Sequence, residues 1–203
     1  MKNQENLWNS LYAKGLSWKK TNKIQENLKD KLVLELGVGN GKTLKSILEH
    51  DPKHVTAIDI SGEAINLVKK SINSEKVSYI TGDFLKTKIK DKFDIIVCYY
   101  FLNNFKEKDR KEVVTKIISM LDKKGIILFE DFALGDLREK GKEIGDNTRE
   151  KQNGLICHFF SKEEIRKLFK GFDIEMRERI FSPIRKNKEI QRKIISAKII
   201  RTR

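Results

Sequence analysis

Three glycines and two acidic residues are spaced in this sequence as a ligand-binding loop requires. In the stretch VLELGVGNGK, Gly37, Gly39 and Gly41 follow a short apolar run and precede apolar residues at helical spacing. Glycine has no Cβ, so the main chain can turn tightly there and ligand atoms can approach it closely. Glu35 stands two residues before the first glycine, and Asp59 stands eighteen residues after the last.

Acidic residues also end the next two apolar runs. Asp59 closes the segment AIDIS, where a carboxylate at a strand tip accepts hydrogen bonds from ribose hydroxyls. Asp83 and Phe84, in TGDF, place a carboxylate for an adenine amino group beside an apolar wall. Ordinary strand-end solvation is the alternative. The third glycine comes one residue too early for the GxGxxG pattern of nicotinamide and flavin enzymes.

Apolar runs alternate with amphipathic stretches, which predicts a parallel sheet with helices on both faces. Strands are predicted at 31–36, 54–59, 77–81, 93–99 and 125–131. Helices are predicted at 41–50, 61–72 and 107–121, after an N-terminal helical segment (3–28, within residues 1–30). A further helix begins at Ser161, which has capping-box spacing with Glu164, and a hairpin joins 172–181 to 192–201.

The length of 203 residues predicts one domain spanning residues 1–203. Within it, the polar, glycine-bearing stretch 132–158 is too long for an idle connection. We interpret it, extended to residue 160, as a substrate loop or lid, and a disordered surface excursion is the alternative.

Charge is distributed unevenly along the chain, whose net charge is +14. Nine of the ten arginines lie between Arg138 and Arg203, and residues 161–203 hold 14 basic against 6 acidic side chains, a net +8. Arginine binds phosphate oxygens bidentately, so this favours a polyanionic partner such as RNA. The alternative is a basic composition without a functional role.

Several classes of protein are disfavoured by the sequence. No apolar run is long enough to span a bilayer, and the first residues have no apolar leader segment, which predicts a cytoplasmic protein with no membrane partner. Cys98 and Cys157 form no CxxC pair, and the three histidines are not clustered, so we expect no metal site.

The motifs LELGVGNG, AIDIS, TGDF, FDIIVCYYFLNNF and LDKKGIILFEDF together resemble those of class I S-adenosylmethionine-dependent methyltransferases. This resemblance covers residues 30–131 and implies a Rossmann-like, seven-stranded, mostly parallel α/β sheet whose C-terminal strand is antiparallel. It also implies S-adenosylmethionine as the cofactor. The expected cofactor-binding residues are Trp18, Glu35, Gly37, Gly39, Gly41, Asp59, Ile60, Asp83, Phe84 and Cys98.

The second half is similar to the tRNA 3-methylcytidine methyltransferase family, through FEDFALGD, GDNTREKQNGLICHFF and RKIISAKIIR. The matching positions are Asp131, Asn147, Lys151, Gly154, Phe159, Phe160 and Arg192. The chain departs from that pattern at Glu130, Phe132 and Asn153, which leaves the RNA position and the methylated atom open. An rRNA cytidine fits as well as a tRNA one.

Methylation of cytosine N3 needs no base, only a group that holds the neighbouring amino group, and Asp131 is our candidate. Methylation at N4 needs an acceptor for amino protons, for which Asn103, Asn104 or Asp131 qualifies. The expected substrate contacts are Arg149, Lys151, Phe160, Arg185 and Arg192. A small-molecule methyltransferase and a non-catalytic cofactor-binding partner protein remain the alternatives, because one fold hosts many functions.

Overall fold

The computed structural model describes residues 2–16, 23–182, 184–185, 188–189 and 191–201. It divides into two compact units, Met1–Val97 with Ser119–Gly125 and Cys98–Ile118 with Ile126–Arg203. Trp18, an expected cofactor contact, lies outside the described residues.

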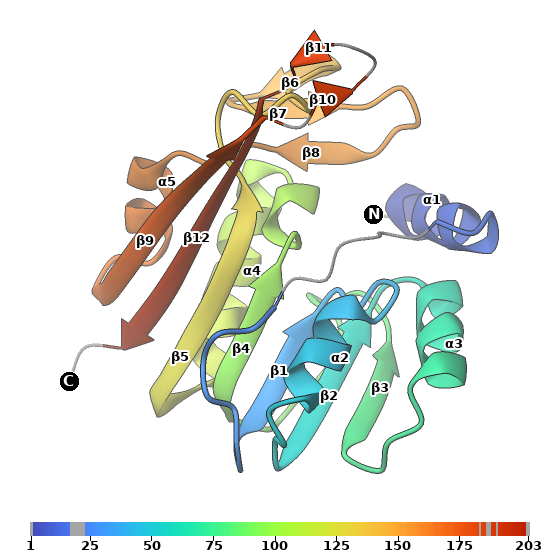
Figure 1. Ribbon diagram of the computed structural model, residues 1–203, viewed down its shortest axis with the longest axis vertical. Helices are drawn as coiled ribbons and strands as arrows, with labels where there is room; N and C mark the ends of the chain where they lie inside the picture. The colour runs from blue at the N-terminus through green and yellow to red at the C-terminus, as the bar shows by residue number, and fades with distance from the viewer. Residues whose placement is uncertain (1, 17–22, 183, 186–187, 190, 202–203) are drawn as a thin grey trace. The chain divides into compact units, whose positions relative to one another are not determined.

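A seven-stranded sheet in the order β3-β2-β1-β4-β5-β12-β9 forms the framework (Figure 1). Its strands are β1 (Leu32–Leu36), β2 (His54–Asp59), β3 (Val77–Thr81), β4 (Phe93–Tyr99), β5 (Leu121–Phe132), β9 (Phe172–Phe181) and β12 (Arg192–Arg201). β1 pairs in parallel with β2 and β4, and β2 with β3. β12 runs antiparallel to both β5 and β9. The predicted sheet, including its antiparallel C-terminal strand, is confirmed.

The first unit contains three helices, α1 (Lys2–Ala13), α2 (Lys42–Leu48) and α3 (Gly62–Ser71). The core between these helices and the strands is apolar: Val33, Leu34, Leu44, Ile47, Val55, Ala57 and Val68 have no exposed surface. Each fully buried aliphatic side chain of this size stabilises the folded state by about 1.5–3 kcal/mol. The strands carry near-continuous apolar runs because both of their faces are covered.

The N-terminal helix is shorter than the predicted 3–28 and ends at Ala13. Gly15 has φ +80°, and the amides of Gly15 and Leu16 donate to the carbonyls of Tyr12 and Leu11, which is the Schellman arrangement that terminates helices. Residues 23–28 are not helical. Ile24 is buried there, and its amide donates to Ser46 Oγ of α2 at 2.9 Å.

The second unit contains the 3₁₀ turn η1 (Leu102–Asn104), α4 (Glu107–Met120) and α5 (Lys162–Leu168). Val113, Val114 and Ile117 form the buried face of α4, at the predicted helical spacing. A short two-stranded ribbon, β10 (Ile184–Arg185) and β11 (Lys188–Glu189), lies between β9 and β12 in the chain.

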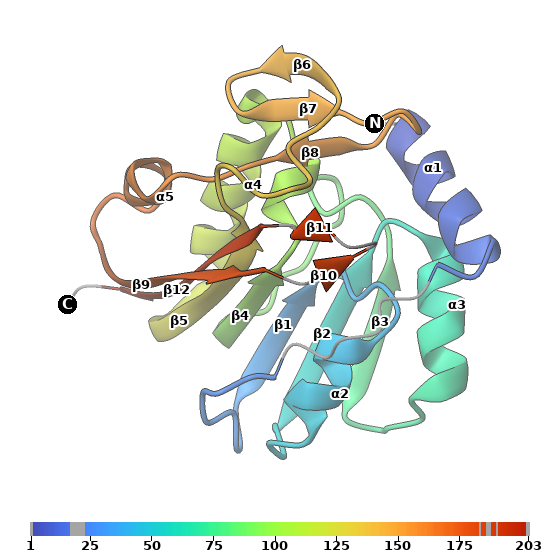
Figure 2. The ribbon, with the colours of Figure 1, turned by 45° about the horizontal axis from the view of Figure 1, so that its top comes forward.

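The stretch 132–158 is an ordered structure and not a disordered excursion. It forms a three-stranded antiparallel sheet of β6 (Lys142–Gly145), β7 (Thr148–Glu150) and β8 (Ile156–His158). Figures 1 and 2 both show this small sheet beyond the end of β5. The amide of Phe160 donates to the carbonyl of Phe132 at 2.8 Å, which fixes β8 to the end of β5. The lid role remains a prediction.

No helix among the described residues is both long enough and apolar enough to cross a bilayer.

Ser61 joins two helices of the first unit, so its hydroxyl is a test of the fold. Its Oγ accepts from the Ala64 amide at 3.1 Å, capping α3, and donates to Asn9 Oδ1 of α1 at 2.8 Å. We expect Ser61→Ala to lower the free energy of unfolding by about 1–2 kcal/mol, measured by urea denaturation. Ser161→Ala, which removes only a cap on α5, is the matched control and should lose less. Equal losses would show that the Asn9 contact contributes nothing.

Candidate functional site

The glycine loop after β1 has the backbone that its sequence predicts. Gly37, Gly39 and Gly41 have φ of 74°, 54° and 77°, a backbone conformation that residues other than glycine rarely adopt. A Cβ at Gly41 would lie 3.1 Å from both Val68 and Ile72, so this glycine also allows α3 to pack closely. The loop is therefore strained for any other residue and leaves its main chain accessible to a ligand.

Asp59 fixes the shape of this loop from the end of β2. Its Oδ2 accepts from the Gly39 amide and its Oδ1 from the Ser61 amide, both at 2.9 Å. Burial raises the pKa of Asp59, and the amide hydrogen bonds from Ser61, Gly39 and Ile60 oppose that rise. A carboxylate offers four lone-pair positions and three amides occupy three of them, so Asp59 can still accept one hydrogen bond from a ligand hydroxyl.

Glu35 is a buried carboxylate without compensation. It is 2% exposed, and neither oxygen accepts a hydrogen bond from any described residue. Burial raises its pKa well above the usual range, the charge of Asp59 adds to this, and the nearby Leu44 amide lowers it. An unpaired buried carboxylate is costly. A cationic or hydrogen-donating ligand would therefore relieve this site.

The other expected cofactor residues of the first unit lie at the ends of β2 and β3. Asp83 Oδ1 accepts from the Leu85 amide at 3.0 Å, while the buried Oδ2 has no hydrogen bond from the described residues. Lys86 Nζ lies 3.7 Å from that oxygen. Phe84 is buried, and Ile60 is partly exposed at the turn after Asp59.

Tyr12 approaches the same loop, although the sequence favours Trp18 over Tyr12 as the aromatic cofactor contact of this segment. Its hydroxyl oxygen would lie 2.9 Å from a Cβ at Gly39, and its ring stacks on Trp8 with centroids 6.0 Å apart. Helix α1 therefore contributes a side chain at the glycine loop. No spacing in the sequence indicated this, because Tyr12 and Gly39 are 27 residues apart in the chain.

In the second unit, the two predicted catalytic residues are in direct contact. Asp131 accepts from the backbone amide of Asn103 at 3.0 Å and from its Nδ2 at 2.7 Å, and also from the Phe132 amide at 2.9 Å. Asp131 is completely buried, and burial raises its pKa to about 8. The carboxyl group orients the Asn103 amide, since Nδ2 must face it and Oδ1 must point elsewhere.

Cys98 also belongs to the second unit. It is fully buried with a free thiol. Burial, followed by the charge of Asp131, raises the pKa of this thiol well above its usual range, so it stays protonated.

Tyr100, which directly follows β4, adopts a backbone conformation unusual for an aromatic residue, with φ +52°. Glu130 holds it there: the Tyr100 amide donates to the Glu130 carbonyl at 2.7 Å, and its hydroxyl donates to Oε1 at 2.9 Å. Arg179 of β9 binds the other oxygen of Glu130. Burial, together with Glu130, raises the pKa of the Tyr100 hydroxyl, which remains a hydrogen-bond donor. Glu130 is thus a structural partner at the position where the sequence departs from the cytidine family.

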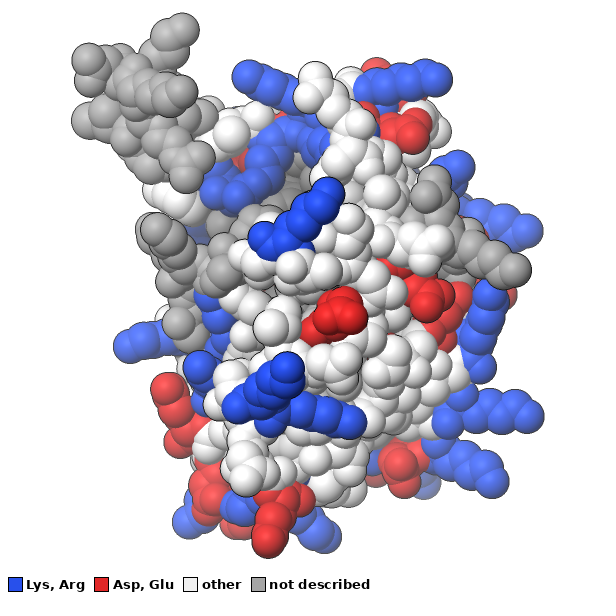
Figure 3. All heavy atoms as spheres, turned by 90° about the vertical axis from the view of Figure 1, so that its right-hand side faces the viewer, with Lys and Arg blue, Asp and Glu red and all other residues white. Residues whose placement is uncertain are grey.

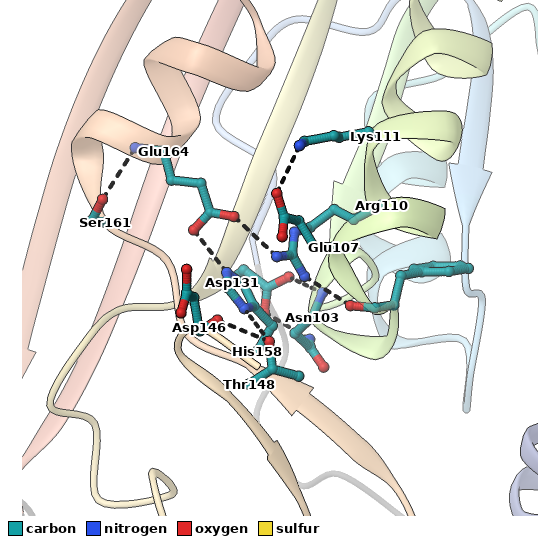
Figure 4. Close-up of polar contacts among 11 residues, drawn as sticks. Asn103, Glu107, Arg110, Lys111, Asp131, Asp146, Thr148, His158, Ser161 and Glu164 are labelled. Atoms are coloured by element: carbon teal, nitrogen blue, oxygen red, sulfur yellow. Dashed lines mark hydrogen bonds and ion pairs between the residues drawn. The ribbon is translucent and has the colours of Figure 1, made fainter. Parts of the chain in front are cut away.

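A chain of polar side chains connects the small sheet to α4 and α5 (Figure 4). Thr148 Oγ lies 2.8 Å from His158 Nδ1, and His158 Nε2 lies 2.7 Å from Glu164. Glu164 also pairs with the buried Arg110 at 3.2 Å, and Arg110 donates to the Phe105 carbonyl at 2.7 Å. These contacts hold the predicted lid against the two helices.

The predicted substrate contacts already have partners within the chain. Arg149 pairs with Glu139 and Glu143, each at 3.3 Å, and Lys151 donates to the carbonyls of Arg138 and Lys140. Arg192 Nε donates to Asp136 at 2.9 Å. Phe160 has no exposed surface. Arg185 lies in β10, and its side chain is outside the described atoms.

Asp136 and Arg138 were not singled out from the sequence. Asp136 is buried and accepts from three donors, the amides of Arg138 and Lys193 and the Arg192 side chain. The Arg138 guanidinium lies 4.9 Å from the ring centroid of Phe132. In the sequence, an acid two residues before an arginine in a polar stretch carries no distinguishing signal.

Part of the chain is similar to a known protein family. Residues 33–125 match the model of the methyltransferase domain. A SAM-dependent methyltransferase from Anabaena variabilis superimposes with a TM-score of 0.72 at 17% identity, over 99% of this chain and 94% of that one. Residues 33–125 thus match a methyltransferase domain, and the chain has the fold of class I S-adenosylmethionine-dependent methyltransferases. The matched range of this domain includes the glycine loop, Asp59 and Asp83.

Two relatives of the methyltransferase domain have different names. The malonyl-[acyl-carrier protein] O-methyltransferase of Priestia megaterium is 28% identical over 73% of this chain and 56% of its own length. The tRNA N(3)-cytidine methyltransferase METTL6 of Pongo abelii is 28% identical over 77% of this chain and 61% of its own length. The chain thus spans a little over half the length of these curated relatives.

Glu35 gives the methyltransferase domain a measurable pH dependence. A raised carboxyl pKa stabilises the fold below about pH 4.5 and loses that contribution as pH rises through the folded-state value. We expect Glu35→Gln to flatten the fall in unfolding temperature of the ligand-free protein above pH 4.5, while weakening binding of S-adenosylhomocysteine. Glu63→Gln, on the exposed surface of α3, is the control for both measurements. If the slope of unfolding temperature against pH is unchanged in Glu35→Gln, Glu35 is not the source of the pH dependence.

His158 should change the pH dependence of stability in the direction opposite to Glu35: its contribution is lost as pH falls. Burial lowers its pKa, and Arg110 lowers it further, against the raising effects of Glu164 and Glu107. His158 Nε2 lies 2.7 Å from Glu164, and Nδ1 lies 2.8 Å from the Thr148 hydroxyl, which donates to the Asp146 carbonyl.

A histidine whose pKa is lowered by folding is protonated more readily in the unfolded state. The free energy of unfolding should therefore fall as pH drops below about 6.5. We expect His158→Gln to reduce that loss between pH 7.5 and 5.5, measured by thermal unfolding. His54→Gln serves as the control and should keep the wild-type slope. If the unfolding temperatures of the two variants change equally with pH, His158 is not the source of the loss of stability.

Proposed function

We propose that this protein transfers the methyl group of S-adenosylmethionine to a cytidine base of RNA, at N3 or N4. The observation that carries the proposal is the pairing of Asn103 with Asp131, directly after β4 and at the end of β5. This pairing supports the proposal because it gives an amide a fixed orientation beside Asp131, the residue that matches the acid of the cytidine methyltransferase family.

The residues of the first unit fit the cofactor. Glu35 lacks a hydrogen-bond donor and suits the cationic amino group, Asp59 suits the ribose hydroxyls, and Asp83 has a buried free oxygen for the adenine amino group. The bare loop at Gly37 and Gly39 admits the ligand to the main chain. When bound, S-adenosylmethionine supplies an activated methyl group on a sulfonium, so the chain mainly has to position the acceptor.

Asn103 and Asp131 have different roles at the acceptor base. Asp131 is completely buried and occupied by three donors, so it acts by positioning Asn103. Asn103 Oδ1 then accepts a hydrogen bond from the exocyclic amino group of cytosine and leaves the N3 lone pair available. For N4, the same oxygen orients the amino group. No base is required for N3, because its lone pair is unprotonated at neutral pH.

RNA as the acceptor is supported by the clustering of arginines and by the METTL6 relatives. Charge alone does not locate the RNA. On the face shown in Figure 3, basic side chains lie among acidic and uncharged ones. Binding therefore has to depend on particular clusters, and its affinity should fall as salt concentration rises.

A small acceptor methylated on oxygen is the second candidate. It is favoured by relatives named malonyl-[acyl-carrier protein] O-methyltransferase, which match the chain at the same level of identity as METTL6. The deciding experiment incubates the protein with labelled S-adenosylmethionine and total tRNA, total rRNA, malonyl-acyl carrier protein or a metabolite extract. Nuclease digestion and nucleoside mass analysis should give a methylated cytidine. Label confined to the carrier protein or metabolites would reject RNA.

The Asn103–Asp131 pair predicts a specific pattern of variants. Asn103→Ala should lower kcat/KM for RNA by about tenfold or more, because one hydrogen bond to the acceptor is lost. Asp131→Asn preserves the side-chain shape but no longer orients Asn103, so it should lower activity similarly.

The double variant should be no worse than either single variant, because the two residues act as one unit. Affinity for S-adenosylhomocysteine should not change, which separates this effect from misfolding. Asn27→Ala, on an exposed turn of the first unit, is the control. Full activity of Asn103→Ala would remove Asn103 from the proposed site.

A further inference from the structure

Arg138 of the second unit is partly exposed and forms no ion pair with the residues that the structure describes. Its Nη1 is buried and donates to no described residue, although the guanidinium lies 4.9 Å from the Phe132 ring centroid. Other arginines of the same region, Arg149 and Arg192, are paired with carboxylates. A buried charged donor without an acceptor is unfavourable, so the site is complete only when an external acceptor is present.

The backbone around Arg138 is fixed, so the guanidinium is not placed by chance. Asp136 Oδ1 accepts from the Arg138 amide at 2.9 Å, and Oδ2 binds Arg192 Nε at 2.9 Å and the Lys193 amide at 2.8 Å. Lys151 donates to the Arg138 carbonyl. Because Arg192 neutralises Asp136, the charge of Arg138 remains available for a ligand.

Aromatic rings surround the same position. The Phe132 ring has the Tyr100 ring at 5.1 Å, the Phe159 ring at 6.1 Å and the Arg192 guanidinium at 5.8 Å. Lys151 Nζ lies 5.2 Å from the Phe159 ring centroid. Phe159 is buried, so Phe132 and Tyr100 are the partly exposed rings of this group. Proteins bind single-stranded nucleic acids through exposed rings next to cations, since bases stack on the rings and phosphates bind the cations.

We propose that Arg138 binds a phosphate oxygen of the RNA strand next to the methylated nucleotide, with the Phe132 ring supporting the guanidinium. The planar fork of arginine fits a phosphate group through two parallel hydrogen bonds, which lysine cannot reproduce. A carboxylate would satisfy the same nitrogen, but it offers no base for the adjacent rings. This inference rests on the proposed function in taking RNA as the ligand.

The test measures binding of a short single-stranded oligoribonucleotide containing one cytidine, by fluorescence anisotropy with S-adenosylhomocysteine present. Arg138→Ala should weaken binding about tenfold or more, and Arg138→Lys should recover only part of the loss. Arg177→Ala, at an exposed position of β9, removes the same charge and should change binding less than twofold. Thermal unfolding of both alanine variants shows whether they are folded.

Replacing each phosphate in turn by an uncharged methylphosphonate identifies the group that Arg138 contacts. One replacement next to the cytidine should weaken binding to the wild type and have no further effect on Arg138→Ala. Equal penalties in both proteins at every phosphate would overturn the proposal, as would equal binding by the Arg138→Ala and Arg177→Ala variants. If Arg138→Ala loses affinity only for malonyl-acyl carrier protein, the ligand is a carboxylate and the phosphate assignment fails.

The binding assay is independent of methyl transfer, so the two proposals can fail separately. Coupling between Arg138 and one phosphate, without any methylated cytidine, would uphold the phosphate site and reject the proposed reaction. A methylated cytidine without such coupling would uphold the reaction and reject the role of Arg138.

Discussion

Asp59 accepts hydrogen bonds from the amides of both Gly39 and Ser61, and this carboxylate sets the geometry on which the first unit depends. A buried carboxylate at the end of a strand has to find donors, and the only groups near enough are amides of the following loops. The glycine loop and the start of α3 are therefore fixed by the same side chain. In this way the sheet positions the bare main chain of the cofactor site.

The second unit uses the same physical principle twice. Asp131 organises Asn103 at the end of β5, and Asp136 organises Arg138 and Arg192 in the following stretch. Carboxylates that are fully satisfied shape the loops, whereas the Glu35 oxygens and Arg138 Nη1 are buried atoms without a hydrogen-bond partner among the described residues. Satisfied groups determine structure, and unsatisfied groups indicate where a ligand of complementary charge binds.

Much of the framework could be predicted because its signals are local. The strands at β1 to β4 agree with the predicted ranges within one residue, since each is a short apolar run that is covered on both faces. The Schellman turn at Gly15 was missed, because a glycine within an amphipathic segment does not reveal whether a helix ends there. The three strands of residues 142–158 were missed as well, because they are too short and polar to show a clear period.

The sequence by itself determined the fold class, the glycine loop and the acids at the strand ends, because these depend on residues close together in the chain. Only the tertiary structure decided which charges are paired. Arg192 meets Asp136 across 56 residues, Arg179 meets Glu130 across 49, and Arg138 pairs with no carboxylate in the described part of the chain. These pairings arise because β12 inserts between β5 and β9, and an antiparallel insertion brings distant side chains together in a register that no local pattern encodes.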